Sequence, residues 1–396
     1  MSATADTESR LIRPWLELAA SRAFGSYQSA IVRIGISLTF LCYLLREIPH
    51  RHELWGPDGP WGIDLAERAV ANSDGFTVLL WSGSDLWFEL AYALAVIASF
   101  CMVIGWRTRL MSVLFTVMVV SFQARNQYLI GGGENILRIM AIYLVLTRCA
   151  QVWSLDARRR ARRGERSVDV TGIGLWVAAG AALVAATVAG HLDRLGWGGA
   201  LWGLWAVQAV WWLVNRRENG EPRAVADMMA NLAHNAVLLI MMAEVCFVYA
   251  TAGWYKIQGS LWQEGVAVYY SMRLDYFSPW PEISEQLSDN SLMVLLMSYG
   301  TVIVQVAFPF TVLNRKVKNV LLGALILEHI GIGILLGLPF FSMAMIAADI
   351  VFLPTVFLLA LDGRVRGLFR RIPPRRKEPA DEPAGEKEPV PEGQPA

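Results

Sequence analysis

Long apolar segments alternate with short polar connections along most of the chain. A bilayer core about 30 Å thick requires a helix of roughly 20 apolar residues. The pattern predicts about eight to ten such helices, because one segment is short and the last two nearly merge. They are expected near residues 28–46, 87–105, 109–122, 135–151, 171–190, 197–214, 234–255, 292–313, 318–337 and 340–361. We therefore predict an all-α, polytopic transmembrane helical bundle.

The composition points to the same class. Hydrophobic residues make up 55% of the 396 residues, 16 of which are Trp, and soluble folds rarely carry so much. A net charge of +1 argues against a nucleic-acid partner and leaves the lipid bilayer as the predicted surroundings. No nucleotide-binding loop, zinc spacing or hydrolase elbow is recognisable. The cysteines at 42, 101, 149 and 246 lie in or beside apolar segments and predict packing rather than a metal site or disulfides.

Basic residues predict the orientation, since Lys and Arg concentrate on the cytoplasmic side of membrane proteins. If ten helices alternate in direction, the basic clusters all fall on one side; they lie at 107–109, 158–166, 216–223, 316–318 and 364–377. We therefore predict a multi-pass protein of the cell membrane with both termini in the cytoplasm. The outer face would hold the loops 47–86, 123–134 and 256–291.

Three parts are expected along the chain. Residues 1–27 predict a cytoplasmic segment without a cleavable secretion signal. Residues 28–361 form the predicted membrane domain. Residues 362–396 begin basic and end rich in Pro and Glu, a composition that cannot bury a core and favours a disordered cytoplasmic tail.

One lysine, Lys256, stands out in the stretch "CFVYATAGWYKIQGSLWQEG". A lysine at a helix end often extends its ammonium to the headgroups. Lys256, however, lies on the side where positive charge is scarce, and its helix also carries Glu244, about three turns deeper. Gly253 permits close approach of a backbone or ligand, and Trp254 and Trp262 can exclude water. Both interpretations, membrane anchor and chemical base, remain open at this stage.

A second polar group opens the helix near residue 135. Asn126 and Tyr128 precede it, and Glu134, Asn135 and Arg138 lie at spacings that place them on one helix face. These side chains either satisfy one another locally or line a pocket.

Further polar residues interrupt the last helices. Glu328, His329 and Asp349 are expected to face the bundle, because unpaired charge in lipid is costly. His329 is either a buried hydrogen-bonded residue or a proton-handling one. Gln305 is interpreted as a packing residue. His50 and His52, in a loop, favour solvated side chains over a metal site.

The order of these pieces resembles the HTTM family (horizontally transferred transmembrane domain), which is related to the vitamin K-dependent gamma-carboxylase and includes proteins that mature peptides. The resemblance rests on "VRIGISLTFLCYLL", "ELWGPDG", "NQYLIGGGENILRIMAIYLVLTRCAQVWSLDA", "YATAGWYKIQGSLWQEG" and "LEHIGIGILLGLPFFSMAMIAADIVFLP". It implies that Lys256 is the position of the base that deprotonates a quinol, with Trp262 and Gly265 in the accompanying motif.

The chain also departs from the carboxylase at several positions. Gln127 stands where the carboxylase has a histidine, and Tyr255 replaces the first of its paired lysines. The large lumenal domain has no counterpart beyond Leu361, so carboxylation of a protein glutamate is not implied. The helices at 171–214 are extra to a shared core of about eight helices.

Two function classes remain. The first is a membrane-embedded enzyme, carboxylase-like or peptide-maturing, that uses Lys256 and His329 on a quinol or on a peptide presented from outside. A quinone-type lipid would be its cofactor or substrate. Its substrate-binding residues would be Asn126, Tyr128, Glu134, Glu244, Trp262 and Gly265. The second class is a non-enzymatic transporter or partner-binding subunit, in which Lys256 and Glu244 bind or gate an anion or a proton.

Overall fold

The computed structural model describes residues 14, 16–162, 169–192, 196–216 and 220–370. Every regular element among these residues is a helix. The chain divides into two compact units, Met1–Thr355 and Val356–Ala396. The first holds the bundle, and the second holds nearly all of α18 (Thr355–Arg370). The predicted Pro- and Glu-rich tail beyond residue 370 and the basic positions Arg163 and Arg166 lie outside the described residues.

The N-terminal half of the larger unit is built on four helices that pack on one another. They are α2 (Ser26–Arg46), α5 (Asp85–Ile104), α6 (Thr108–Arg125) and α7 (Gly132–Leu146). Edge-on aromatic contacts join them, with Phe40 packing against Phe115 and Phe122. The short helices α3 (Arg51–Trp55) and α4 (Ile63–Asn72) fill the connection between α2 and α5. Trp55 of α3 reaches the same aromatic core at Phe122.

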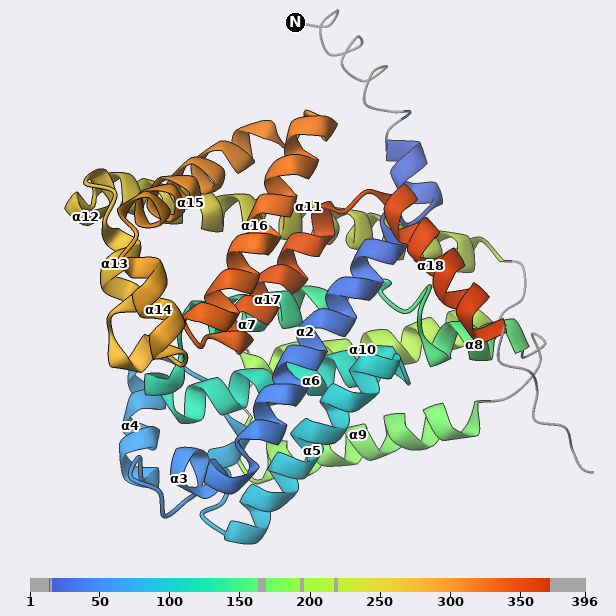
Figure 1. Ribbon diagram of the computed structural model, residues 1–396. Coiled ribbons are helices and arrows are strands. Elements are labelled where there is room, and N and C mark those ends of the chain that lie inside the picture. The colour runs from blue at the N-terminus through green and yellow to red at the C-terminus, as the bar shows by residue number, and fades with distance from the viewer. Residues whose placement is uncertain (1–13, 15, 163–168, 193–195, 217–219, 371–396) are drawn as a thin grey trace, which may run out of the picture. The chain divides into compact units, whose positions relative to one another are not determined.

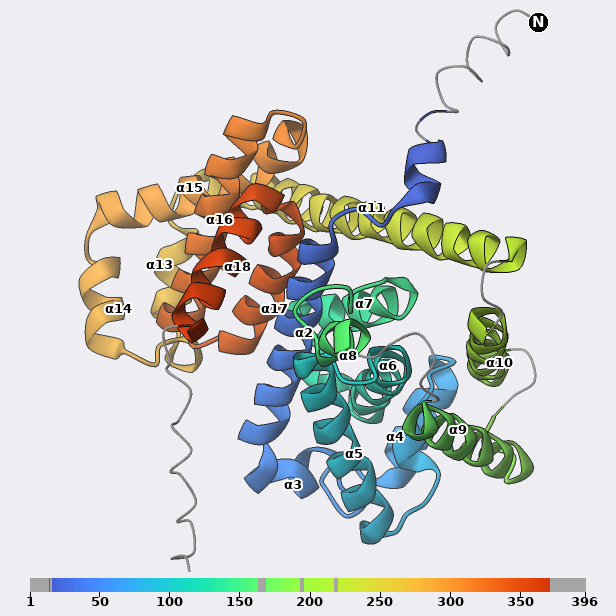
Figure 2. The same cartoon turned by 90° about the vertical axis from the view of Figure 1, so that its right-hand side faces the viewer.

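Two apolar helices, α9 (Val170–Val188) and α10 (Trp197–Arg216), form a separate pair (Figure 2). Trp176 and Trp205 stack with ring centroids 4.1 Å apart. Each indole N–H donates to the backbone carbonyl of the other residue, at 3.2 Å and 3.0 Å. Asp169 caps α9 and binds Arg107, which lowers the pKa of the Asp169 carboxyl to about 2 and keeps it ionised at neutral pH. These helices correspond to the pair that the sequence identifies as extra.

The C-terminal half begins with α11 (Glu221–Gln258), a helix of 38 residues. The short helices α8 (Leu155–Arg162), α12 (Ser260–Gln263), α13 (Ala267–Met272) and α14 (Pro281–Ser288) lie in connections. The long helices α15 (Ser291–Thr311) and α16 (Arg315–Leu335) follow, and then α17 (Pro339–Asp349). Helix α15 packs on α11, α16 on α15, and α17 on α16 and α2, so α17 joins the two halves (Figure 1).

Six of the described helices are long and apolar enough to cross a membrane, or seven if the broken pair after residue 339 counts as one span. The six are α2, α5, α9, α11, α15 and α16. Helices also occur at the other predicted positions, but α7, for example, has only 15 residues. About ten membrane-spanning helices are therefore not confirmed, and the apolar helices that are found are compatible with a multi-pass membrane protein.

The predicted helix 340–361 is wrong as a single element. Helix α17 ends at Asp349, and a 3₁₀ turn, η5 (Ile350–Phe352), follows before α18 begins. Pro354 explains the break, because the residue before a proline is pushed out of the α region, and Leu353 is extended with ψ 138°. The ammonium of Lys318 donates to the carbonyl of Phe352 and so satisfies the end of this turn.

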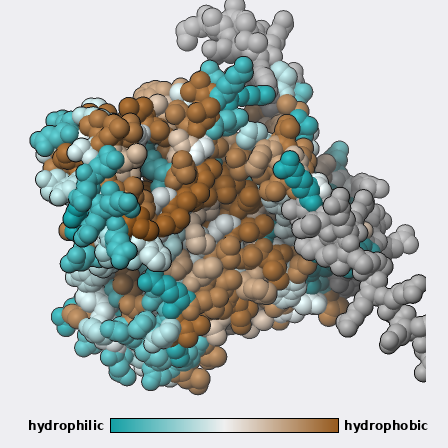
Figure 3. Space-filling view, viewed as in Figure 1, coloured by the Kyte–Doolittle hydropathy of each residue, from teal (hydrophilic) through white to brown (hydrophobic). Residues whose placement is uncertain are grey.

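One face of the molecule is largely hydrophobic (Figure 3). Hydrophilic residues gather at the edge where α3, α4 and α14 lie in Figure 1, while α8 lies at the opposite edge. The predicted outer loops 47–86 and 256–291 thus lie at one end of the larger unit, and the basic helix α8 at the other.

Arg33 is a fully buried cation in the middle of α2. Its guanidinium donates to four backbone carbonyls, those of Met102, Val103, Cys149 and Trp153. Two of these carbonyls belong to the end of α5 and two to the connection before α8. Because the last carbonyls of a helix lack intrahelical partners, Arg33 supplies charged donors to the end of α5 and to the connection before α8.

Candidate functional site

Lys256 lies in the last turn of α11 and is half-buried. Its ammonium donates to Oε1 of Gln305 on α15 at 2.8 Å. The Nε2 of Gln305 in turn donates to Oε1 of Glu328 on α16 at 2.6 Å. The ammonium also sits 5.2 Å from the ring centroid of Trp262, within cation–π range. Lys256 therefore points into a contact between three apolar helices and does not extend freely to headgroups.

Gly253 explains how α15 comes close enough for this contact. Gly253 is buried one turn before Lys256, and a Cβ placed on it would lie 2.7 Å from Cγ2 of Val306. Val306 follows Gln305 directly, so the missing side chain admits the backbone that carries the lysine's partner. The close approach expected at Gly253 is thus that of another helix.

A second set of polar side chains lies on α11, α16 and α17. The hydroxyl of Tyr249 donates to the Asp349 carboxylate, whose oxygens are 2.9 Å and 2.8 Å away. Nε2 of His329 is 3.0 Å from that hydroxyl. Nδ1 of His329 is buried and has no hydrogen-bond partner among the described residues. Tyr249, His329 and Asp349 are each at most 2% exposed.

The two clusters are neighbours. Tyr249 and Lys256 are seven residues apart on α11, which places them on one helix face, and Glu328 and His329 are adjacent on α16. The charge of Lys256 acts on both Glu328 and His329, and the charge of Glu328 acts on Asp349. We call the six residues Tyr249, Lys256, Gln305, Glu328, His329 and Asp349 the polar cluster.

The predicted site residues Asn126, Tyr128 and Glu134 make local contacts that do not involve the polar cluster. The Asn126 side chain donates to the carbonyl of Leu54 and accepts from the backbone of Tyr128, which makes it a turn cap. Tyr128 is 80% exposed and packs against Trp61. Glu134 accepts from the backbone N–H of Gly131 and caps α7.

Helix α17 separates this region from His329. Phe341 packs on the His329 ring at 5.5 Å, and the backbone of Phe341 lies against Gly133 at the start of α7. A cavity of about 20 Å³ between Asn126, Glu134 and Phe340 has room for one water molecule. Of the predicted site residues, the described contacts thus join Lys256, His329 and Trp262, and leave Asn126, Tyr128 and Glu134 apart.

The remaining predicted residues support the site or lie away from it. Gly265 has φ +74° after α12, where a side chain would also meet Leu295. The negative charge of Glu244 interacts with Tyr143 of α7, and the Glu264 side chain is exposed. The carboxylate whose charge interacts with Lys256 is that of Glu328. Trp254 is 61% exposed, which leaves Trp262 as the aromatic cover.

The sequence did not identify the partners of Lys256 and His329, which are Gln305, Glu328, Tyr249 and Asp349. It nevertheless carried a signal for three of these four residues. Polar residues within apolar helices must find partners in one another, and Gln305, Glu328 and Asp349 are such residues. Tyr249 carried no signal, because aromatic residues are common throughout this chain.

His52 pairs with Glu89 at 2.7 Å. Among the described residues, no group of three His, Cys, Asp or Glu side chains is arranged to hold a metal.

Comparison of the chain with protein-family models, curated proteins and solved structures finds no match. The class of the protein therefore rests on its own features. The described part of the chain is all-helical, and its several long apolar helices are compatible with an integral, multi-pass membrane protein.

A substitution at Gly253 should separate α11 from α15. We expect Gly253→Leu to lower the free energy of unfolding by about 1–3 kcal/mol, because the added side chain collides with Val306. Thermal unfolding of the purified protein in detergent measures this change. Gly300→Leu on α15 is the matched control, since nothing lies within 4 Å of a Cβ placed there. Equal losses in the two variants would contradict close packing at Gly253.

Proposed function

We propose that the protein is a membrane-embedded enzyme in which Lys256 acts as a base. The observation that carries this proposal is the pairing of Lys256 with Gln305 inside the helical bundle, with Glu328 behind it. A lysine that merely anchors a helix needs no such support, because its ammonium is satisfied by water and headgroups. In this proposal both termini lie in the cytoplasm and the polar cluster opens outward.

The chemistry of the site suits proton abstraction. A neutral Lys256 amine would take the proton of a substrate hydroxyl, so that the substrate O–H bond breaks and an N–H bond forms. The resulting ammonium is stabilised by the Gln305 carbonyl, the face of Trp262 and the negative charge of Glu328. The substrate anion would remain next to the ammonium as its counter-ion.

A lipid-soluble quinol is the proposed substrate, with an outward-presented peptide group as the other candidate. The apolar helices around Lys256 favour a substrate that arrives from the bilayer. The resemblance to the HTTM family and the gamma-carboxylase supports the same chemistry, because its lysine motif falls on Lys256, Trp262 and Gly265.

Turnover of a quinol tests the proposal. The purified chain is reconstituted into liposomes with a reduced naphthoquinol and oxygen, and the loss of quinol and any oxygenated product are measured by liquid chromatography and mass spectrometry. The proposal expects consumption above that of protein-free liposomes. A rate equal to the protein-free rate for both quinol and a panel of peptides would refute the enzyme assignment.

A second candidate function is proton transfer by a carrier. The specific observation is that two sets of titratable side chains lie on the same helices, Lys256 with Glu328, and Tyr249 with His329 and Asp349. Titratable groups inside a membrane domain are typical of proton pathways. Liposomes containing the protein and a pH-sensitive dye would then show proton uptake under a membrane potential, and that uptake would require Asp349.

A further inference from the structure

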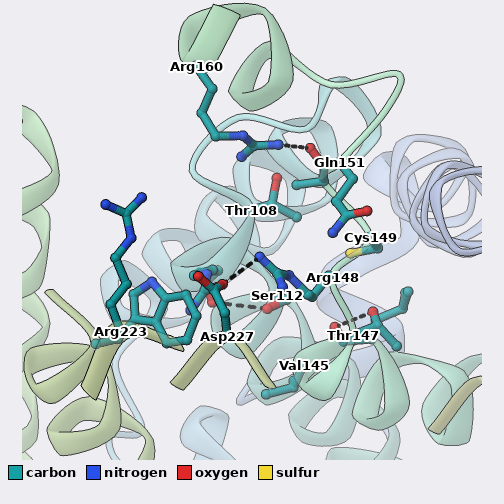
Figure 4. A pocket seen from close by; sticks show the side chains of 14 residues that line it. Thr108, Ser112, Val145, Thr147, Arg148, Cys149, Gln151, Arg160, Arg223 and Asp227 are labelled. Carbon is teal, nitrogen blue, oxygen red and sulfur yellow. Dashed lines mark hydrogen bonds and ion pairs between the residues drawn. The ribbon is translucent and has the colours of Figure 1, made fainter. Parts of the chain in front are cut away.

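A second polar site lies away from the polar cluster, at the start of α6 and the end of α7. A cavity of about 560 Å³ is lined there by residues of α6, α7, α8, α10, α11 and the connection after α7 (Figure 4). A cavity of this size is in the range that holds small-molecule ligands. It lies among the basic connections that the sequence places on the cytoplasmic side.

Four arginines from different elements surround this cavity. Arg109 comes from α6, Arg148 from the connection after α7, Arg160 from α8 and Arg223 from the first turn of α11. Among the described residues, one carboxylate, that of Asp227, lines the cavity with them. The positive charges of Arg148 and Arg160 act directly on Arg109. Cations gathered around one space repel each other, so the arrangement is unfavourable unless an anion enters.

The contacts of the arginines leave donors free. Arg148 is held by Asn231 at 2.6 Å and by Asp227 at 3.1 Å, and Arg160 by the carbonyl of Ala150 at 2.6 Å. Cζ of Arg109 lies 4.1 Å from the centroid of the Trp211 ring, a cation–π contact. Arg109 and Arg223 have no hydrogen-bond or ion-pair partner for their guanidinium groups within the described part of the chain.

We propose that this cavity binds a phosphate group, with Arg148 and Arg160 fixed as its frame and Arg109 and Arg223 closing on the anion. Planar guanidinium groups match the oxygens of a phosphate and bind it with paired hydrogen bonds. The phosphate belongs either to the headgroup of an anionic phospholipid or to a soluble phosphorylated compound. The shared chemistry is the same, and the cavity lies where a bilayer headgroup layer and the cytoplasm would meet.

Binding is measured on the full chain in detergent by native mass spectrometry and by thermal shift. The probes are phosphatidylglycerol, zwitterionic phosphatidylcholine, inorganic phosphate and ATP, each titrated separately. We expect one molecule of an anionic phosphate-bearing probe, and not of phosphatidylcholine, to be retained and to raise the unfolding temperature. Retention of phosphatidylglycerol alone identifies the lipid source, and retention of phosphate or ATP identifies a soluble one.

The double variant Arg109→Gln/Arg223→Gln should weaken this binding at least about tenfold, because two charge-assisted contacts are lost. The matched control is Arg158→Gln/Arg162→Gln, which removes two charges from exposed α8 positions outside the cavity and should change binding less than about twofold. Arg223→Gln alone serves if the double variant does not fold. No retention of any probe, or equal weakening by the cavity and control variants, would overturn the proposal.

Discussion

Replacing Lys256 with Met should abolish quinol turnover while leaving the protein folded. Met keeps the length and apolar packing of the lysine stem but removes the amine that hydrogen-bonds to Gln305. General-base catalysis contributes about 10²- to 10⁴-fold, so we expect activity in liposomes to fall at least about 100-fold. The yield of monodisperse protein and its unfolding temperature should remain close to those of the wild type.

Two further variants separate chemistry from structure. Lys256→Arg keeps a cation beside Gln305 but removes a residue that can become neutral, so it should remain inactive. Lys316→Met removes an exposed lysine from α16 and should retain activity. If Lys256→Met lost expression and Lys256→Arg restored both expression and turnover, Lys256 would be a structural cation.

Arg33→Met should cause the largest loss of stability. It removes four hydrogen bonds from the guanidinium to backbone carbonyls, and hydrogen bonds to charged groups contribute about 1.5–3 kcal/mol each. We expect a loss of at least about 3 kcal/mol, seen as a fall of about 5 °C or more in the unfolding temperature or as a failure to express. The change is measured by size-exclusion chromatography after heating.

The matched control for Arg33 lies on the same helix. The Arg46 side chain is 63% exposed and pairs with Glu47 at 3.4 Å, and an exposed ion pair of this kind contributes little. Arg46→Met should therefore leave the unfolding temperature nearly unchanged. An Arg33→Met variant as stable as Arg46→Met would mean that the carbonyls find other partners.

The helices could be predicted from the sequence because lipid imposes a simple length requirement. The segment predicted at 28–46, for example, is observed as α2, Ser26–Arg46. The pattern could not show that α11 extends back to Glu221, because its first turns are polar and amphipathic. It also missed the break after Asp349, since the residues across it remain apolar although Pro354 interrupts the helix.

The partners of Lys256 were harder to predict. Periodicity identifies which face of a helix a residue occupies, but not which neighbouring helix meets that face. Glu244 shares α11 with Lys256 and therefore attracted attention, whereas the interacting carboxylate, Glu328, lies 72 residues further along on α16. Similarly, the side chains of Asn126 and Glu134 accept hydrogen bonds from nearby backbone N–H groups and cap helices. The sequence alone could not predict this capping role, because it depends on the backbone geometry.

Photoaffinity labelling with a diazirine-bearing quinone tests most directly whether Lys256 is the centre of a quinol site. The full chain in liposomes is irradiated with the probe, and the labelled peptides are mapped by mass spectrometry with and without excess unmodified quinone. We expect competed labels on α11 and α12 around Lys256 and Trp262 and on α15 around Gln305. Helix α9, only 11% of whose apolar window is buried, is the control for lipid-exposed labelling. Labels confined to α9 and similar surfaces, and unchanged by competitor, would contradict a quinol site at Lys256.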